Sequence, residues 1–233
     1  MSVKGPAEGP GLEPVLGLLG GTFDPVHYGH LRAAAVVRHA LRLAEVRLLP
    51  AGDPPHRAAP VAPAAHRLAM LELALAEFPG LTLDGREIAR TGKSYTVLTL
   101  EELRAEAPRR PLALIVGADA FLGLPTWHRW QALFDLAHLV VVTRPDTGLL
   151  PPPGPLADAW TRHAVVDPGV LETTPAGAIF PLSIPPQPIS ASMIRKALAA
   201  GPHGMDAVRG MVPSAVLAYI DRNQLYRSRP DAT

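Results

Sequence analysis

The residues best suited to chemistry in this chain are two histidines, His27 and His30, which follow a glycine pair, Gly20 and Gly21. An apolar run at residues 15–19 precedes the glycines, and an amphipathic segment follows the second histidine. This order predicts a buried parallel strand, a tight turn and then a helix. Because a helix N-terminus offers unpaired N–H groups and glycines allow close approach, the segment predicts a site that binds a polyphosphate and stabilises it during reaction.

These residues belong to a longer stretch, residues 20–30, with the sequence Gly-Gly-Thr-Phe-Asp-Pro-Val-His-Tyr-Gly-His. It resembles the signature of the nucleotidylyltransferase superfamily, Gly-x-Phe-x-Pro-x-His-x-Gly-His. A second stretch, residues 189–195, has the sequence Ile-Ser-Ala-Ser-Met-Ile-Arg and resembles that superfamily's Ile-Ser-x-Ser/Thr-x-Ile/Val-Arg motif. Since two such motifs rarely occur by chance at the two ends of one α/β domain, the chain is identified as a member of this superfamily.

The resemblance implies a nucleotidyl transfer that needs no protein nucleophile. An oxygen of the acceptor attacks the α-phosphorus of a nucleoside triphosphate and pyrophosphate leaves, so the protein supplies position and charge stabilisation. His30 is then expected to contact the α-phosphate, His27 the same or a neighbouring phosphate, and Thr22 to donate its hydroxyl and N–H. The ATP contacts of this motif are expected from Gly20, Gly21, Thr22, Phe23, His27 and His30. Taken alone, the two histidines would also fit surface polar residues or a weak metal pair.

The second motif implies a further phosphate site. Ser190 is a residue type that caps helices, and Arg195 follows one turn inside the expected helix, on the same side as Ser192. The resemblance implies that Ile189, Ser190, Ser192 and Arg195 bind ATP, with the helix N-terminus and the guanidinium directed at the β- and γ-phosphates. The alternative is that Ser190 only caps the helix.

Residues outside both motifs complete the expected ATP site. Arg57 ends a loop rich in turn residues and is expected to contact a phosphate, unless it is a solvated loop charge. Gly117 and Asp119 follow a buried strand, and the resemblance implies that they bind the adenosine ribose; the alternative is a turn with an Asp cap. Asp24 is interpreted as a turn residue beside Pro25 and is assigned no metal. Mg²⁺ is the expected cofactor, carried with ATP through phosphate oxygens and water.

Three further segments indicate the acceptor. Residues 94–96, 125–130 and 137–145 together resemble bacterial nicotinate mononucleotide adenylyltransferases, and the resemblance spans residues 15–227. It implies that AMP is transferred from ATP to nicotinate mononucleotide, giving deamido-NAD and pyrophosphate.

The expected acceptor-binding residues are Tyr95, Thr96, Trp127, His128 and Arg144. Trp127 offers a flat face for a pyridine ring, unless it is a core aromatic. Backbone N–H groups around Trp127 and His128, with Tyr95 and Thr96, are suited to the nicotinate carboxylate. The family commonly has tyrosine where this chain has His128, so a backbone contact is what the resemblance implies there.

Two alternatives stay open. One is a phosphopantetheine adenylyltransferase, although such chains are typically shorter and lack the Ser-Tyr-Thr and Thr-Trp-His elements. The other is a non-catalytic nucleotide sensor on the same fold, against which the intact His27, His30, Ser190 and Arg195 argue.

Alternating strands and helices must position these residues. Apolar runs predict strands at residues 15–19, 46–50, 81–83, 112–116 and 139–143, with two shorter strands at about 163–166 and 178–182. Helical spacing predicts helices at residues 28–44, 63–77, 94–107, 190–199 and 213–222. The alternation predicts an α/β fold with a doubly wound, mainly parallel, Rossmann-like sheet that binds ligands at the carboxyl ends of its strands.

The expected domain organisation is one nucleotidylyltransferase domain at residues 15–227, with a helical C-terminal subdomain at about residues 189–227. Residues 1–14 and 228–233 are expected to be loose tails, and the Pro/Gly-rich residues 146–155 a surface loop.

Composition limits the remaining classes. Hydrophobic residues make up 48% of the chain, and the net charge of +1 gives no support for a general nucleic-acid surface. The absence of cysteine excludes disulfides and thiolate metal sites. No apolar stretch approaches the roughly 20 residues needed to span a bilayer. We therefore expect a cytoplasmic enzyme whose partners are ATP and nicotinate mononucleotide, with no nucleic acid and no membrane, while association into a homo-oligomer stays open.

Overall fold

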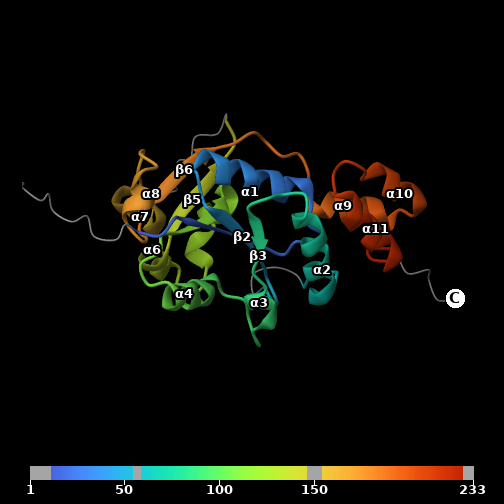
Figure 1. Ribbon diagram of the computed structural model, residues 1–233, viewed down its shortest axis with the longest axis horizontal. Helices are drawn as coiled ribbons and strands as arrows, with labels where there is room; N and C mark the ends of the chain where they lie inside the picture. Colours follow the sequence, from blue (N-terminus) through green and yellow to red (C-terminus); the bar gives the residue numbers. More distant parts are fainter. Residues whose placement is uncertain (1–11, 55–58, 146–153, 228–233) are drawn as a thin grey trace, which may run out of the picture.

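The computed structural model of the protein describes residues 12–54, 59–145 and 154–227 (Figure 1). In these residues a six-stranded, all-parallel sheet has the order β3-β2-β1-β4-β5-β6. The strands are β1 (Leu16–Gly21), β2 (Glu45–Pro50), β3 (Leu81–Leu83), β4 (Leu112–Gly117), β5 (His138–Thr143) and β6 (Ile179–Ser183). The prediction of a doubly wound parallel sheet is therefore confirmed.

The strand order places a crevice at the centre of the sheet. The chain runs outward from β1 through β2 to β3, and then returns to the other side of β1 to form β4. Ligands of open α/β sheets bind at such a switch point, outside the carboxyl ends of the strands. The first motif follows β1 and residues 117–119 follow β4, so both lie at this edge.

Helices cover both faces of the sheet, which explains why its strands are apolar without alternation. In β4, Leu112, Leu114 and Val116 pack into one core cluster, whereas Ala113 and Ile115 pack into the other. The first cluster includes residues of α4 (Thr96–Glu106), α5 (Ala118–Leu122), α6 (Leu133–Leu136) and α7 (Pro155–His163). The second includes residues of α1 (Tyr28–Ala40), α2 (Ala64–Leu75), α8 (Val170–Thr173), α9 (Ala191–Ala199) and α11 (Ser214–Arg222). In Figure 1, α1 and α4 lie on opposite sides of the strands.

Short elements complete the described chain. They are α3 (Arg86–Ala89), α10 (Pro202–Ala207) and two 3₁₀ turns, Leu124–Thr126 and Trp130–Ala132. Sequence periodicity could not predict them, because each is about one turn long.

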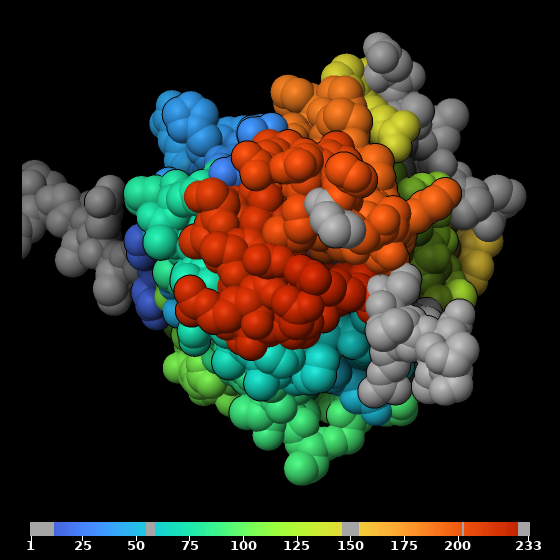
Figure 2. Space-filling model, turned by 90° about the vertical axis from the view of Figure 1, so that its right-hand side faces the viewer, coloured from blue at the N-terminus to red at the C-terminus, as the bar shows by residue number. Residues whose placement is uncertain are grey.

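The C-terminal helices α9, α10 and α11 gather at one end of the molecule (Figure 1), and Figure 2 shows them, orange to red, seated against the blue and teal segments. Val216, Ile220 and Tyr226 belong to the same core cluster as β1-flanking Val15. The Tyr226 hydroxyl donates to Asp24 Oδ1 at 2.7 Å, which joins the segment after α11 to the first motif. We propose from this that residues 15–227 fold as one unit, with a helical C-terminal part at residues 189–227.

The predicted strand at residues 163–166 is wrong. His163 ends α7, and Ala164 makes only an isolated parallel bridge with Ile179. The His163 ring stacks on Phe134 at 4.5 Å between ring centroids, and its Nδ1 lies 2.7 Å from the carbonyl of Gly177. These side-chain contacts favour a helix end where the apolar pattern suggested a strand.

The end of the first helix and the extent of one loop also differ from the prediction. The first helix ends at Ala40 and not at residue 44, because Arg42 adopts a left-handed conformation with φ of 50°. The predicted loop at residues 146–155 lies mostly outside the described residues, but Pro155 is the first residue of α7, a position that proline favours.

The buried hydrogen bond between Tyr226 and Asp24 gives a test of this packing. Tyr226→Phe removes one of the donors to a carboxyl group that is 4% exposed, and we expect the free energy of unfolding to fall by about 1–3 kcal/mol. Urea unfolding measures it. The matched control is Tyr28→Phe, whose hydroxyl binds Glu77 in an exposed position and whose loss should cost about 0.5 kcal/mol or less. Equal losses in the two variants would contradict the buried role of Tyr226.

Candidate functional site

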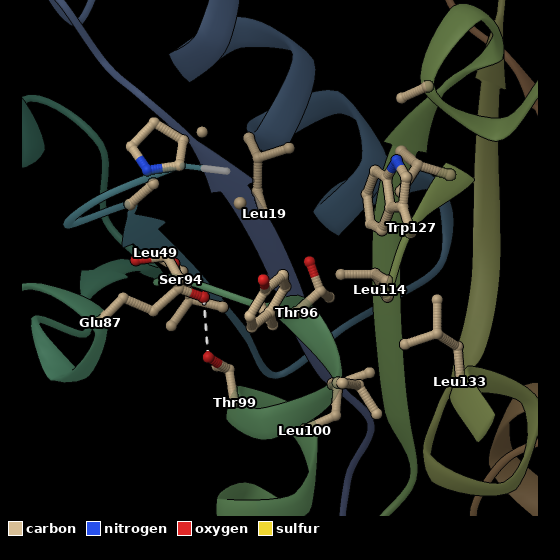
Figure 3. Close-up of a pocket in the computed structure, with 18 of the residues that line it drawn as sticks. Leu19, Leu49, Glu87, Ser94, Thr96, Thr99, Leu100, Leu114, Trp127 and Leu133 are labelled. Carbon is tan, nitrogen blue, oxygen red and sulfur yellow. Dashed lines mark hydrogen bonds between the residues drawn. The ribbon is translucent and has the colours of Figure 1, made fainter. Parts of the chain in front are cut away.

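A cavity of about 420 Å³ opens at the carboxyl ends of β1 and β4, where the strand order predicts a ligand site. Its walls are the end of β1, the start of α4 and the segment after β4 (Figure 3). Leu49, Leu100 and Leu114 form apolar parts of the wall, while Glu87, Ser94 and Thr96 supply polar groups. A site of this size with a mixed lining suits one small organic substrate.

The structure divides the predicted site residues into two groups. The cavity is lined by Gly20, Gly21, Thr22, Tyr95, Thr96, Gly117, Asp119, Trp127 and His128. Outside its lining lie Phe23, His27, His30, Arg144, Ile189, Ser190, Ser192 and Arg195. Arg57 falls outside the described residues. The segment at residues 20–22 belongs to both the cavity and the first motif, so it forms the border between the two groups.

The two histidines of the first motif lie face to face. The rings of His27 and His30 stack with 3.7 Å between centroids and 25° between planes. Gly29 makes this possible, because a Cβ there would lie 2.8 Å from His27 Nδ1 and 3.3 Å from the carbonyl oxygen of Ile189. The same glycine therefore lets the second motif approach the first.

Burial lowers the pKa of His27 from 6.5 to about 4. The residue is 4% exposed, and its Nδ1 has no hydrogen-bond partner within the described part of the chain. Neutral imidazole is therefore the form at pH near neutrality. The structure therefore leaves His27 as a neutral hydrogen-bonding ring, so a fixed positive charge at this site comes from another residue.

Arg195 supplies that charge and links the two motifs. Its Nη1 donates to the carbonyl oxygen of Asp24 at 2.7 Å, and its Nη2 donates to Ser192 Oγ at 3.4 Å. The side chain keeps 30% of its surface exposed, so the guanidinium is held in place without being enclosed.

Ser190 is the N-cap of α9, because its Oγ accepts a hydrogen bond from the N–H of Met193 at 3.2 Å. The capping alternative is therefore present in the structure. A capped helix end can still bind a phosphate through its other N–H groups, and that role of α9 stays a proposal.

Asp24 has a larger role than the turn residue interpreted from the sequence. Its Oδ2 accepts from the N–H of Val61 at 2.7 Å, and its Oδ1 accepts from the N–H of Ala62 at 3.0 Å and from Tyr226. These partners are distant in the chain, so no local signal could have indicated them. The result is that the turn after β1 is fixed by three hydrogen bonds from two distant segments of the chain.

At the other end of the cavity, Trp127 is partly buried and lines the wall (Figure 3). Trp127 also packs against the core cluster that includes Leu133, so the core-aromatic alternative stays open. Trp130 is more deeply buried, with 7% of its surface exposed, and packs edge-on against Phe134. The His128 ring lies 4.5 Å from the Tyr95 ring, between centroids. His128 therefore contacts a neighbouring predicted residue through its side chain. Arg144 is exposed just after β5 and is the one predicted acceptor residue outside the cavity lining.

Glu87 lines the cavity and was not predicted. Thr99 Oγ1 donates to Glu87 Oε1 at 2.8 Å (Figure 3). Burial raises the pKa of Glu87, and hydrogen bonds from Thr99 and Ser94 act in the opposite direction. Its sequence neighbourhood carries no recognisable motif, so only the tertiary structure indicates it.

The loop after β2 is held against this side of the cavity. Ser94 Oγ accepts from the N–H of Gly52 at 2.9 Å and from that of Asp53 at 3.2 Å. A side chain on Gly52 would collide with the carbonyl oxygen of Glu87, so glycine is required for this approach. The Ser-Tyr-Thr segment therefore positions a loop as well as lining the cavity.

Among the described residues, no three or more histidine, aspartate or glutamate side chains gather closely enough to bind a metal ion. In the same residues, no helix is both long and apolar enough to cross a bilayer.

Comparisons with known proteins agree with this geometry. The family model described as cytidylyltransferase-like matches residues 18–197. A protein of Acidithiobacillus ferrooxidans named "probable nicotinate-nucleotide adenylyltransferase" is 47% identical over 211 residues, covering 91% of this chain and 95% of that protein. A protein of Laribacter hongkongensis with the same name is 50% identical over 220 residues, covering 93% and 96%.

A solved structure has the same fold. The Plasmodium falciparum nicotinic acid mononucleotide adenylyltransferase complexed with NaAD matches with a TM-score of 0.69 and 16% identity, covering 92% of this chain and 98% of that one. At this identity the likeness supports the fold alone.

The buried ring of His27 predicts a pH dependence of stability. Between pH 6.5 and about 4 the unfolded chain binds a proton that the folded protein does not. The stabilisation is therefore complete above about pH 6.5 and is lost as the pH falls toward 4, by roughly 3 kcal/mol in the free energy of unfolding. Urea unfolding of wild type and His27→Asn from about pH 4.5 to about pH 7.5 measures this difference, which should grow with pH.

The control for this experiment is His39→Asn, which removes an exposed imidazole from the same helix. Its stability relative to wild type is measured over the same pH range, so that the change specific to the buried ring of His27 can be read from the comparison. Parallel curves for wild type and His27→Asn would show instead that His27 titrates normally in the folded protein.

Proposed function

Because this chain belongs to the cytidylyltransferase-like family, we propose that it transfers AMP from ATP to nicotinate mononucleotide, giving deamido-NAD and pyrophosphate. The observation that carries the proposal is that residues 20–22 line the cavity and also belong to the first motif. There a cavity fit for an aromatic acceptor meets the motif that, by resemblance, binds the phosphates of the donor. Relatives of 47% and 50% identity bear the name of this activity, which favours it over phosphopantetheine transfer or nucleotide sensing.

In this reaction the main task of the protein is to align the acceptor phosphate with the α-phosphorus of ATP. A phosphate oxygen of the acceptor forms a bond to the α-phosphorus, the bond to the bridging oxygen of the β-phosphate breaks, and pyrophosphate leaves with that electron pair. The substrates bring both the nucleophile and the leaving group, so the protein contributes position and stabilisation of developing charge.

The acceptor is proposed to occupy the cavity. Trp127 offers its ring face to the pyridine, and Tyr95 and Thr96 lie at the N-terminus of α4, where N–H groups favour an anion such as the nicotinate carboxylate. The ring of His128 rests on Tyr95, so its contribution to the substrate is proposed through its N–H. Arg144, exposed at the end of β5, is proposed to meet the acceptor from outside the cavity.

The donor is proposed to lie across the first and second motifs. Asp119, in the first turn of α5, is proposed to accept from a ribose hydroxyl, with Gly117 beside it. The backbone of Gly20, Gly21, Thr22 and Phe23, with His27 and His30, would bind the α-phosphate side. Ser192, Arg195, Ile189 and the end of α9 capped by Ser190 would bind the leaving pyrophosphate. Arg57 is proposed as one more phosphate contact.

The electrostatics of the site assign different roles to these groups. Since His27 is neutral, its part is to donate a hydrogen bond, while Arg195 supplies a fixed positive charge. Adenylyl transfer from ATP generally uses a divalent metal, and we propose Mg²⁺ bound to the triphosphate of the substrate, because the described residues offer no cluster of metal ligands of their own. Dependence on ATP supports a cytoplasmic location.

The first test concerns substrate choice. Pyrophosphate release from Mg-ATP should be fast with nicotinate mononucleotide, about tenfold slower with the amide analogue because charge-assisted bonds to a carboxylate are stronger, and undetectable with phosphopantetheine. Equal catalytic efficiency for acid and amide would remove the carboxylate argument. Turnover of phosphopantetheine at the same rate would overturn the assignment.

The second test concerns His30. If it stabilises charge developing on the α-phosphate, His30→Ala should lower turnover by on the order of 10²–10³ while ATP binding changes much less. The control is His66→Ala, which removes a half-buried histidine of α2 that is hydrogen-bonded to Tyr219 of α11 and belongs to neither motif. Melting temperature and single-turnover rate are measured on the same preparations. A His30→Ala protein that turns over normally once folded would leave the chemistry to Thr22, His27 and backbone donors.

A further inference from the structure

Arg67 of α2 is the largest side chain among those that are almost completely buried, with 1% of its surface exposed. Its guanidinium donates to carbonyl oxygens of three separate segments. The acceptors are Thr22 at 2.9 Å, Ala51 at 2.7 Å, Gly52 at 3.4 Å and Ala62 at 3.2 Å. Because no carboxylate lies within ion-pairing distance in the described residues, this buried cation is held by backbone carbonyls.

Burying a guanidinium costs free energy that an apolar side chain at the same position of the helix would not cost. Removing a guanidinium from water costs several kcal/mol unless its surroundings compensate. Leu71 and Met70 occupy neighbouring buried positions of the same helix at no such cost. The value of an arginine here is therefore the fixed geometry of its donors, which spread over a rigid planar group.

The carbonyl of Thr22 orients the first motif. The peptide that joins Thr22 to Phe23 is planar and trans, so directing its oxygen toward Arg67 turns the Phe23 N–H the opposite way. Gly21 is fixed in the same manner, because its oxygen accepts from the N–H of Ala51 at 2.9 Å, and this turns the Thr22 N–H away from β2. The two N–H groups of the motif thus take their directions from these bonds.

The carbonyls of Ala51 and Gly52 connect the same guanidinium to the acceptor cavity. Ala51 lines the cavity, and the N–H of Gly52 is bonded in turn to Ser94, next to Tyr95. One side chain therefore holds the donor motif and the loop beside the acceptor at a fixed separation.

We propose that Arg67 is a positioning residue for adenylyl transfer, setting the alignment between the Thr22–Phe23 peptide on the donor side and the loop at residues 51–52 on the acceptor side. The inference rests on the proposed function. Since reacting groups displaced by about 1 Å can lose about 10²-fold in rate, loosening this link should slow the chemical step more than it weakens binding of either substrate.

The chain offers a matched control in Arg104 of α4. Its guanidinium also donates to backbone carbonyls, among them those of Arg110 at 2.7 Å, Leu136 at 2.6 Å and Pro175 at 3.0 Å. Pro175 is the acceptor for the N–H of Leu112, at the amino end of β4, so this cluster lies at the opposite edge of the sheet from the site. Arg104 is only partly buried, but Arg104→Lys likewise loosens a cluster of backbone carbonyls held by one guanidinium, at the edge of the sheet opposite the site.

The experiment compares Arg67→Lys with Arg104→Lys. A lysine presents a single ammonium and cannot reach four carbonyls, so both variants should lose thermal stability. Single-turnover rates with enzyme in excess over Mg-ATP and nicotinate mononucleotide report the rate per folded molecule. We expect Arg67→Lys to react at least about tenfold more slowly, with KM values little changed, and Arg104→Lys to stay within about twofold of wild type.

The outcomes separate the possibilities. Equal single-turnover rates in the two variants, with equal loss of stability, would overturn the positioning role and leave Arg67 as a structural residue. A wild-type protein that transfers AMP to no acceptor would overturn the proposed function and this inference with it. If Arg67→Lys does not fold, Ser94→Ala tests the next link of the same chain of contacts, and an unchanged rate there overturns the proposal.

Discussion

The structure depends on the way the turn after β1 is held. Asp24 accepts hydrogen bonds from the N–H groups of residues 61 and 62 and from Tyr226, and its own carbonyl accepts from Arg195. Segments from the start, middle and end of the chain therefore meet at one residue. Because this turn carries the first motif, its geometry is fixed by the packing of the C-terminal helices as well as by the sheet. Loss of the Tyr226 hydroxyl or of either N–H group leaves a buried carboxyl group short of a donor, which costs more than the loss of a surface bond would.

The same principle applies to the site as a whole, where polar groups are held by contacts that do not involve substrate. Arg195 is restrained by a carbonyl, Ser94 by two N–H groups and Glu87 by a threonine hydroxyl. A reaction whose nucleophile and leaving group both belong to the substrates benefits from such restraint, because alignment and preorganised dipoles are what the protein can add. The neutral ring of His27 fits this picture, since burial that fixes the ring also removes its charge.

Most strands of the sheet and the longer helices could be predicted from the sequence. Apolar runs predicted β1, β2, β4 and β5, since strands covered on both faces lack alternation. Long amphipathic segments predicted α1, α2, α4, α9 and α11. The prediction missed α7 (Pro155–His163) and the elements of about one turn, and it was wrong at residues 163–166, where His163 packs on Phe134 and ends a helix.

The sequence by itself determined the sheet, the family and the two motifs, because these reside in local periodicity and in residue types at fixed spacing. Only the tertiary structure decided that Asp24 is a junction, that Glu87 faces the cavity, that His27 is neutral and that Arg67 binds carbonyls of three segments. Each of these depends on desolvation or on contacts between residues far apart in the chain. Such properties arise only when folding brings distant backbone groups together and excludes water from them, and no short stretch of sequence contains that information.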